Sequence, residues 1–240
     1  MHPQVEYLIS KDYASQRSDE WLSLRGNMLT ASDAATAIGD NPYEKAEDLI
    51  LKKCGHNKFH GNEFTAHGNK YEDEARDIYC EKYNEKCHEI GLHPHPKYTW
   101  LGGSPDGLTE SGKLVEIKCP MKRKITPEVP KYYMPQLQLL MEILDLEEAV
   151  FIQYKPTEIT WPKEAEFVVT EVKRDRQWFQ DKLPIMDELW KRVLWHRENG
   201  VESLLKPNKK RSNNKKTEVK IEKCEIVDCV EDQPNVFSDA

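Results

Sequence analysis

The sequence predicts a mixed α/β fold in which a central mixed sheet is flanked by helices on both faces. Three observations predict it: segments with helical periodicity, short runs rich in β-branched and aromatic residues, and the order in which these segments alternate. At 240 residues the chain is long enough for one sizeable domain with a tail, or for two small domains. We assign a domain to residues 1–205 and a charged tail to residues 206–240.

The first third of the chain is predicted to be helical. Capping residues and apolar residues at helical spacing indicate helices over residues 18–26, 30–39, 46–55 and 64–83. Ser18 suits the N-cap of the first helix, and Thr30 with Asp33 resembles a capping box at the start of the second. In the longest helix, Glu72 lies beside the expected buried face.

Strands predominate in the middle of the chain. They are predicted at residues 89–93, 98–104, 113–118, 149–154 and 167–172, with a helix over 131–144 between the third and the fourth. A final amphipathic helix is predicted over residues 174–198. Pro184 should kink this helix or split it in two, because proline lacks the N–H that the helix needs.

The tail is predicted to be disordered, because it is polar, contains proline and has few large apolar side chains. Residues 206–216 carry six basic side chains and no acidic one. The run Lys206–Arg211 fits a nuclear-targeting or DNA-contacting patch, and fits a solvated linker at least as well.

The composition favours a soluble intracellular protein. No stretch approaches the ~20 apolar residues that span a bilayer, and the N-terminus has no apolar core of the signal-peptide kind. Six scattered cysteines indicate reduced thiols. The net charge of −7 argues only weakly against a nucleic-acid partner, because four basic residues cluster after residue 121, at Lys122, Arg123, Lys124 and Lys131.

Two carboxylates and a lysine form the most informative motif. A Ser-Pro-Asp-Gly run contains Asp106, and Glu116-Ile117-Lys118 follows on a predicted strand, with turn residues at 110–112 between them. A hairpin about this turn places Asp106 across from Glu116, with Cβ atoms ~4.5–5.5 Å apart, close enough for both to bind one cation. Because side chains alternate along a strand, Lys118 shares the face of Glu116 while Ile117 points into the core.

A purely structural interpretation fits either half of the motif alone. Asp-Gly often marks only a turn, and Glu-x-Lys on a strand is often a solvated face. Together they favour phosphodiester hydrolysis, in which carboxylates hold one or two Mg²⁺ ions with open positions for water and substrate. Asp106, Glu116 and the Ile117 carbonyl would be the ligands, and Lys118 would orient or deprotonate the water or hold the phosphate. Glu72 would add a carboxylate, as a metal ligand or behind the ligands.

The residues resemble the YqaJ/λ-exonuclease branch of the PD-(D/E)xK nucleases. The resemblance covers about residues 18–172 and is carried by four ordered motifs: Gly68-x-x-x-Glu72, Ser104-Pro105-Asp106-Gly107-Leu108, Glu116-Ile117-Lys118-Cys119-Pro120 and Tyr133-Met134-Pro135-Gln136. It implies a restriction-endonuclease-like core. It also implies a set of active-site residues, namely Glu72, Asp106, Glu116, Lys118 and Gln136.

The resemblance further implies a pocket for the phosphate of a DNA end. Arg25 and Ser32 are seven residues apart, as are the two residues of the family that hold the 5′-phosphate. A helix N-terminus near Ser32 would suit an anion. The alternative is a surface arginine beside an ordinary N-cap serine.

By resemblance, the activity is Mg²⁺-dependent digestion of linear double-stranded DNA from 5′-phosphorylated ends in the 5′→3′ direction, with Mn²⁺ as a substitute. The single strands produced would serve recombination with an annealing partner, and the enzyme would be a ring-shaped trimer. If the protein is viral, it would act in the host cytoplasm or nucleus. Two alternatives remain: an endonuclease of the same fold, and a DNA-end-binding protein without turnover.

An iron–sulfur cluster is not expected. Some related nucleases hold one with one early and three late cysteines, whereas this chain offers Cys119 early and only Cys224 and Cys229 late.

Overall fold

The computed structural model describes residues 1–56 and 61–205, and the strands in these residues form two mixed sheets. This confirms the mixed α/β class, although the predicted strands divide between two sheets instead of joining one. The tail at 206–240, with its basic run and with Cys224 and Cys229, lies outside the described residues. None of the helices in the described ranges is long and apolar enough to cross a membrane.

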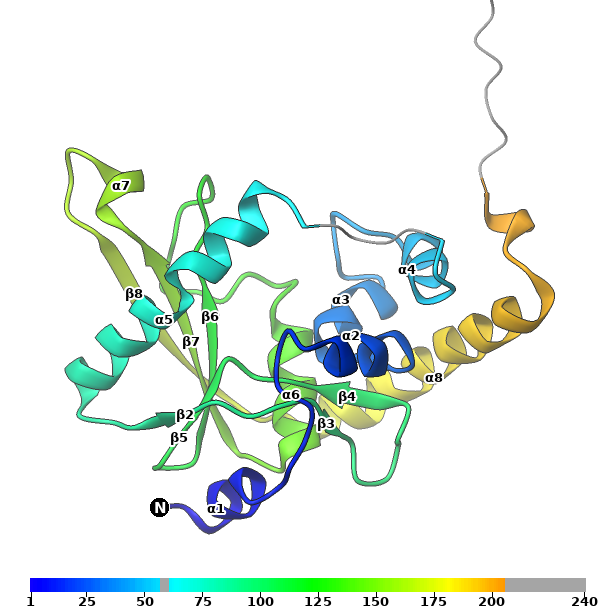
Figure 1. Ribbon diagram of the computed structural model, residues 1–240, viewed down its shortest axis with the longest axis horizontal. Coiled ribbons are helices and arrows are strands. Elements are labelled where there is room, and N and C mark those ends of the chain that lie inside the picture. Colours follow the sequence, from blue (N-terminus) through cyan, green and yellow to red (C-terminus); the bar gives the residue numbers. More distant parts are fainter. Residues whose placement is uncertain (57–60, 206–240) are drawn as a thin grey trace, which may run out of the picture. The chain divides into compact units, whose positions relative to one another are not determined.

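The larger sheet carries the Asp106–Lys118 motif. Its strands are ordered β2-β5-β6-β7-β8, with bounds Cys87–His88, Gly107–Thr109, Lys113–Lys118, Glu148–Lys155 and Glu166–Lys173. β6 pairs antiparallel with β5 and parallel with β7, whereas β7 and β8 are antiparallel and form the long twisted ribbon in Figure 1. β6 is therefore a central strand, which explains why its interior residues are all buried.

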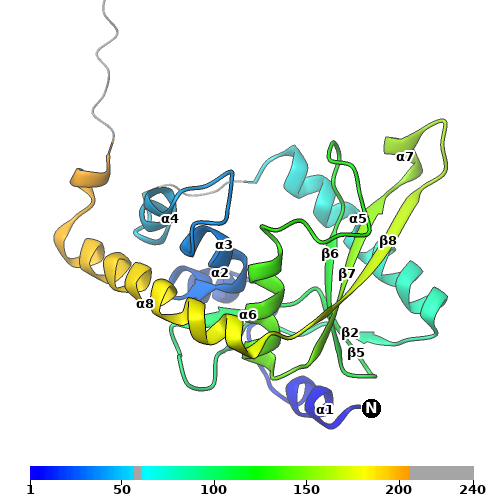
Figure 2. The ribbon, with the colours of Figure 1, turned by 180° about the vertical axis from the view of Figure 1, so that it is seen from behind.

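One helix covers each face of β6 and β7. α5 (Glu63–Tyr83) packs Tyr71 and Ala75 against a cluster that includes Val115 and Ile117. α6 (Met134–Leu144) packs against the other face, in the main core cluster with Leu114. Successive β6 residues thus face different helices, and Figures 1 and 2 show α5 and α6 on opposite sides of the strand.

The smaller sheet joins the N-terminal part of the chain to the middle. Its order is β1-β4-β3, with bounds Leu29–Thr30, Leu101–Gly103 and His93–Pro94. The predicted strand over 98–104 therefore does not form the hairpin with β6, which pairs with β5 instead. Pro105 accounts for the difference, because proline cannot donate to a ladder and separates β4 from β5.

The predicted N-terminal helices form with altered lengths. α2 (Asp19–Gly26) begins at the predicted N-cap, where the Ser18 hydroxyl accepts a 3.1 Å hydrogen bond from the Trp21 N–H. The segment 30–39 is not one helix but a 3₁₀ turn, η1 (Ala31–Asp33), followed by the short α3 (Ala34–Ala37). α4 (Ala46–Lys53) follows, and α1 (Pro3–Ile9) was not predicted.

The C-terminal helix α8 (Arg176–Asn199) runs through Pro184, so the alternative of two separate helices is wrong. Both halves bury apolar side chains, Phe179 before the proline and Met186, Leu189 and Trp190 after it. This packing compensates for the hydrogen bond that the proline removes. The short α7 (Thr157–Thr160) lies between β7 and β8, and η2 (Glu202–Leu204) follows α8.

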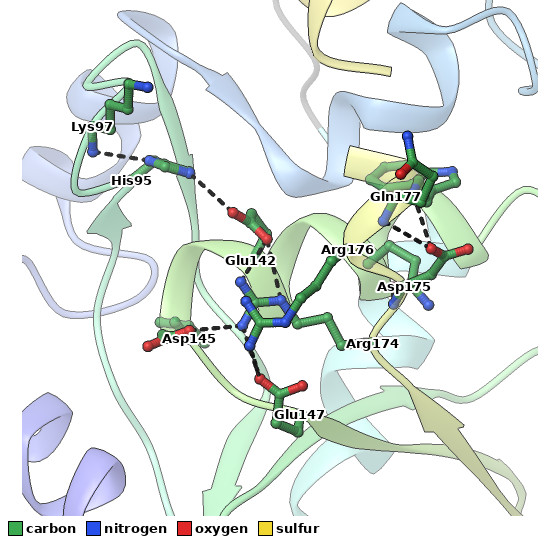
Figure 3. A network of polar contacts seen from close by, with 12 residues as sticks. His95, Lys97, Glu142, Asp145, Glu147, Arg174, Asp175, Arg176 and Gln177 are labelled. Carbon is green, nitrogen blue, oxygen red and sulfur yellow. Dashed lines mark hydrogen bonds and ion pairs between the residues drawn. The ribbon is translucent and has the colours of Figure 1, made fainter. Parts of the chain in front are cut away.

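A cluster of charged side chains fastens the end of α6 to the segment that enters α8 (Figure 3). The buried Arg174 guanidinium bonds to Glu142 at 2.6 Å, Asp145 at 2.7 Å and Glu147 at 3.3 Å. His95, from the loop between β3 and β4, faces Glu142 across 3.8 Å. The cluster fixes α6, whose first turn carries Gln136.

Candidate active site

The hairpin of β5 and β6 brings the two acidic residues together. Gly107 pairs with Val115, and continuing this register by one residue places Asp106 across from Glu116, as the sequence predicts. The Asp106 carboxylate accepts a 2.7 Å hydrogen bond from the Ile117 N–H. Gly112, with a φ of 102°, makes the turn in a conformation that glycine adopts easily.

Glu116 is the most constrained member of the site. Its carboxylate is buried, and one oxygen, Oε1, receives the Lys118 ammonium and a 2.6 Å hydrogen bond from the Gln136 amide. The other oxygen, Oε2, has no hydrogen-bond partner within residues 1–56 and 61–205. A buried carboxylate oxygen without a donor is costly, so this atom fits a cation ligand.

The carboxylates of the site are hard to ionise. Burial and the Asp106 carboxylate together raise the pKa of Glu116 to about 8, and the same two causes raise the pKa of Glu72 to about 7. Burial opposes the charged form of Lys118, but Glu116 and Asp106 outweigh it and raise the pKa of Lys118 above its ordinary value. Lys118 therefore stays protonated, and its ammonium is the cationic group that contacts the buried Glu116 carboxylate.

Glu72 reaches the site from α5 and is held by arginines. Its carboxylate lies 3.0 Å from the Arg17 guanidinium and 3.7 Å from that of Arg76. No group of three or more His, Cys, Asp or Glu side chains in the described part of the chain is arranged to hold a metal. The oxygen donors that lie together are Asp106, Glu116 and the backbone at Ile117, and Glu72 lines the same cleft as Asp106.

The site opens into a cleft of about 940 Å³. Glu72, Asp106 and Lys118 line it together with Lys122 and Arg123 from the loop after β6. Lys124 and Lys131 are exposed and do not line it.

Arg123 is held in a fixed position. Its Nη1 donates a 2.7 Å hydrogen bond to Oε1 of the buried Gln153, which pairs with Lys118 across β6 and β7. Its Nη2 is buried and has no partner among the described residues. Gln153 was not predicted from the sequence, because a single polar residue inside an apolar strand does not indicate which side chain it contacts.

Arg25 and Ser32 lie together, as the resemblance implies. Arg25 donates a 2.8 Å hydrogen bond to the Ser32 hydroxyl and lies over the Trp21 ring, 4.3 Å from its centroid. Burial lowers the pKa of Arg25, and the Asp33 and Glu116 carboxylates oppose this effect. The helix that would follow Ser32 is only a 3₁₀ turn and four further residues, so the predicted helix N-terminus adds little to anion binding.

A buried ion pair between Lys53 and Asp33 lies next to Arg25 and Ser32. Thr30 and Asp33 form the predicted capping box, and the Lys53 ammonium reaches Asp33 at 2.6 Å and the Arg25 carbonyl at 2.8 Å. Burial opposes ionisation of Asp33, but Lys53 and Lys52 outweigh it and hold the pKa of Asp33 well below its usual range.

The N-terminal segment also hydrogen-bonds to the Ser-Pro-Asp-Gly run. The Trp21 indole donates to the Ser104 hydroxyl at 2.9 Å, and the Gln16 amide donates to the Pro105 carbonyl at 2.7 Å. Sequence reasoning missed both residues, since nothing in their local pattern distinguishes them from ordinary surface residues.

Residues 20–147 match the model of the YqaJ-like viral recombinase domain. Protein R354 of Acanthamoeba polyphaga mimivirus is 32% identical over 159 residues, which are 58% of this chain and 29% of that protein. Protein D345L of African swine fever virus is 31% identical over 163 residues, 53% of this chain and 46% of that protein. The chain thus matches less than half the length of either relative.

Solved structures of exonucleases share the fold. The alkaline exonuclease of Laribacter hongkongensis is 23% identical with a TM-score of 0.64, covering 76% of this chain and 95% of that one. A phage-related exonuclease from Haemophilus somnus is 14% identical with a TM-score of 0.54, covering 74% and 96%. Together with the domain match, this likeness confirms the nuclease-type fold that the four motifs predict.

Proposed function

Because the chain belongs to the YqaJ-like viral recombinase domain family, we propose that it is a metal-dependent deoxyribonuclease that digests linear double-stranded DNA from 5′-phosphorylated ends, 5′→3′. The observation that carries the proposal is the Glu116 carboxylate. It is buried beside Asp106, fixed through one oxygen by Lys118 and Gln136, and without a partner for its other oxygen in the described residues. A structural ion pair would not need that arrangement.

The oxygen donors fit a hard divalent cation. Asp106, Glu116 and the Ile117 carbonyl would hold one or two Mg²⁺ ions, or Mn²⁺ in their place. The orphaned Glu116 oxygen supports this assignment, as does the raised pKa of Glu116, since a bound cation would offset the burial and the nearby Asp106 carboxylate that cause it. A bound cation supplies an acidified water and neutralises charge on a phosphate.

The protein's own side chains would orient the reaction. Lys118, kept protonated by its carboxylate neighbours, would hold the scissile phosphate or the attacking water. Gln136 keeps the Glu116 carboxylate in one orientation, and Glu72 would add a carboxyl group to the cleft beside Asp106. Arg25 and Ser32 would bind the terminal 5′-phosphate, since a guanidinium and a hydroxyl can both donate to it.

Basic side chains would follow the DNA backbone into the cleft. Lys122 and Arg123 line it, whereas Lys124 and Lys131 would meet the backbone outside it. The proposed products are single strands for recombination, passed to an annealing protein. By family resemblance the enzyme would be a ring-shaped trimer, acting in the cytoplasm or nucleus of a host cell.

One assay tests the activity. The protein is incubated with Mg²⁺ and either linear duplex with 5′-phosphates or closed circular duplex of the same sequence. Loss of the linear substrate alone, with mononucleotides as products, supports the exonuclease. Nicking of the circle would instead indicate an endonuclease of the same fold. Binding without cleavage would instead indicate a DNA-end-binding protein.

A further inference from the structure

Aromatic side chains from separate parts of the sequence line the same cleft as Asp106 and Lys118. They come from the segment between α3 and α4, from the first turn of α5 and from the loop before α6, and they are Tyr43, Phe64, Tyr132 and Tyr133. None of the catalytic roles proposed above uses them.

Three of these rings form a row that starts in the core. Tyr133 lies 5.5 Å from the buried Phe151, Tyr132 lies 4.5 Å from Tyr133, and Tyr43 lies 5.4 Å from Tyr132, measured between ring centroids. The inner end of the row is anchored by packing. The outer end is free, because Tyr43 is 79% exposed.

Packing among residues 1–56 and 61–205 does not account for the exposure of Tyr43 and Phe64. Phe64 is 44% exposed although it is wholly apolar. Tyr43 sits on an ordered turn, where its N–H donates a 2.9 Å hydrogen bond to Asn41, whose amide is bound to Thr36 at 2.8 Å. Tyr43 is therefore presented to solvent by a hydrogen-bonded turn and Phe64 by the first turn of α5, so a ligand would meet both rings with little ordering cost.

Cationic side chains lie beside the same rings. The Lys122 ammonium is 5.1 Å from the Phe64 ring centroid, and the Arg123 guanidinium is 5.9 Å from that of Tyr133. Alternation of cations and aromatic faces matches a nucleic-acid strand, which alternates phosphates and bases. An apolar peptide or a lipid chain would not use both kinds of group.

We propose that Tyr43, Phe64 and Tyr132 form a stacking subsite for unpaired nucleobases of the DNA strand whose phosphates contact Lys122 and Arg123. The proposal rests on the proposed nuclease function and adds the form in which the strand enters the cleft. Neighbouring pairs cover both faces of every base in a duplex except at its last pair, so bases behind the end must leave the duplex to stack on these rings. Stacking uses the face of the base, so the subsite accepts any sequence.

The test measures binding without turnover, in buffer with EDTA. Affinity is compared for a 5′-phosphorylated single strand and for the same strand with abasic sites near its 5′ end. Wild-type protein should bind the base-bearing strand more tightly. Tyr43→Ala should weaken that binding roughly 5- to 150-fold and leave the abasic strand unaffected.

Two variants control the interpretation. Tyr43→Phe keeps the ring and should retain the preference for the base-bearing strand. Trp161→Ala removes another exposed aromatic residue, 78% exposed and outside the cleft lining, and should change neither affinity.

The stacking subsite and the nuclease function can fail separately. Equal affinity for base-bearing and abasic strands in a protein that digests linear duplex would overturn the subsite alone. An unchanged preference in Tyr43→Ala, Phe64→Ala and Tyr132→Ala would also overturn it. Absence of both DNA binding and cleavage would overturn both proposals.

Discussion

Gln136 donates a 2.6 Å hydrogen bond to Glu116 across 20 positions of the chain. The contact joins the first turn of α6 to the middle of the larger sheet, so the helix and the acidic strand are held in one geometry. It uses the same Glu116 oxygen that receives Lys118. The second oxygen is thereby directed away from both groups, and the carboxylate is oriented before any cation arrives.

Replacing Lys118 by alanine should abolish cleavage while DNA binding survives. The Lys118 ammonium touches Glu116 and lines the cleft, whereas most of the binding energy for DNA would come from the phosphate contacts proposed for other basic side chains. Cleavage of linear duplex and binding in EDTA are measured side by side, with the exposed Lys163→Ala as a control. Wild-type turnover in Lys118→Ala would remove its catalytic assignment.

Mg²⁺ should stabilise the protein more at pH 8.5 than at pH 6. The raised pKa of Glu116, about 8, and of Glu72, about 7, mean that protons compete with a cation near neutrality. Without a cation, these carboxyls stabilise the fold below their unfolded pKa and lose that stabilisation as the pH rises through the folded value. The melting temperature of the cation-free protein should therefore fall between pH 6 and 8.5.

The cation should restore this loss. At about 100 times its dissociation constant a ligand adds ~2.7 kcal/mol, a rise of roughly 5–10 °C for a protein of this size. Differential scanning calorimetry at both pH values measures the effect. Glu116→Gln is the control, because it removes the titrating group, and an equal Mg²⁺ shift in that variant would exclude Glu116 as a ligand.

The acidic hairpin was predictable from sequence because all its determinants are local. A turn at 110–112 and a period of two fix the register between Asp106 and Glu116 without reference to the rest of the fold. The long helix α5 was predictable for the same reason, since apolar residues recur at helical spacing over 21 residues. The two carboxylates and the lysine on this hairpin then indicated metal-dependent phosphodiester hydrolysis.

The remaining features depend on contacts between distant segments. β1 and β3 are two residues long and too short to show periodicity, so their pairing with β4 gave no sequence signal. The contact of Tyr43 with Tyr132 joins segments whose only common feature is an aromatic side chain. The predicted split of α8 at Pro184 was wrong, because the helix is continuous and packs apolar side chains into the core on both sides of the proline.

Arg25→Ala should impair digestion mainly of 5′-phosphorylated ends. The Arg25 guanidinium bonds to Ser32, and these two groups are the proposed contacts of the terminal phosphate. Losing a charge-assisted contact of this kind costs about 1.5–3 kcal/mol, or roughly 10- to 150-fold in kcat/KM. Initial rates on 5′-phosphate and 5′-hydroxyl duplexes are compared. An equal loss on both substrates would remove the proposed role.

Lys53→Met should destabilise the fold by roughly 3 kcal/mol, because it leaves the buried Asp33 carboxylate without its closest cation. Lys52→Met is the matched control: Lys52 is partly exposed and lies 3.2 Å from the same carboxylate, so its loss should cost about 1 kcal/mol or less. Urea denaturation at neutral pH measures both. An equal loss of unfolding free energy in both variants would show that the burial of Lys53 does not strengthen its ion pair with Asp33.

The effect of Lys53→Met should shrink in acid. The lowered pKa of Asp33 means that its ion pair stabilises the fold above the unfolded pKa, near 4, and loses this effect as the pH falls below it. The difference between variant and wild type should thus be full at pH 6 and smaller at pH 3. The Glu116 carboxyl titrates well above this window, so the two effects are separable.

Arg174→Met should destabilise the protein by roughly 2–4 kcal/mol, because the Arg174 side chain is 4% exposed and contacts three carboxylates at the end of α6. Arg176→Met is the matched control, since Arg176 is 60% exposed and bonds to Glu147 alone in this cluster. Its loss should cost about 1 kcal/mol or less. Because the cluster fixes α6, Arg174→Met should also lower cleavage by displacing Gln136. A variant with a lowered melting temperature that still cleaves normally while folded would show that the cluster does not affect the active site.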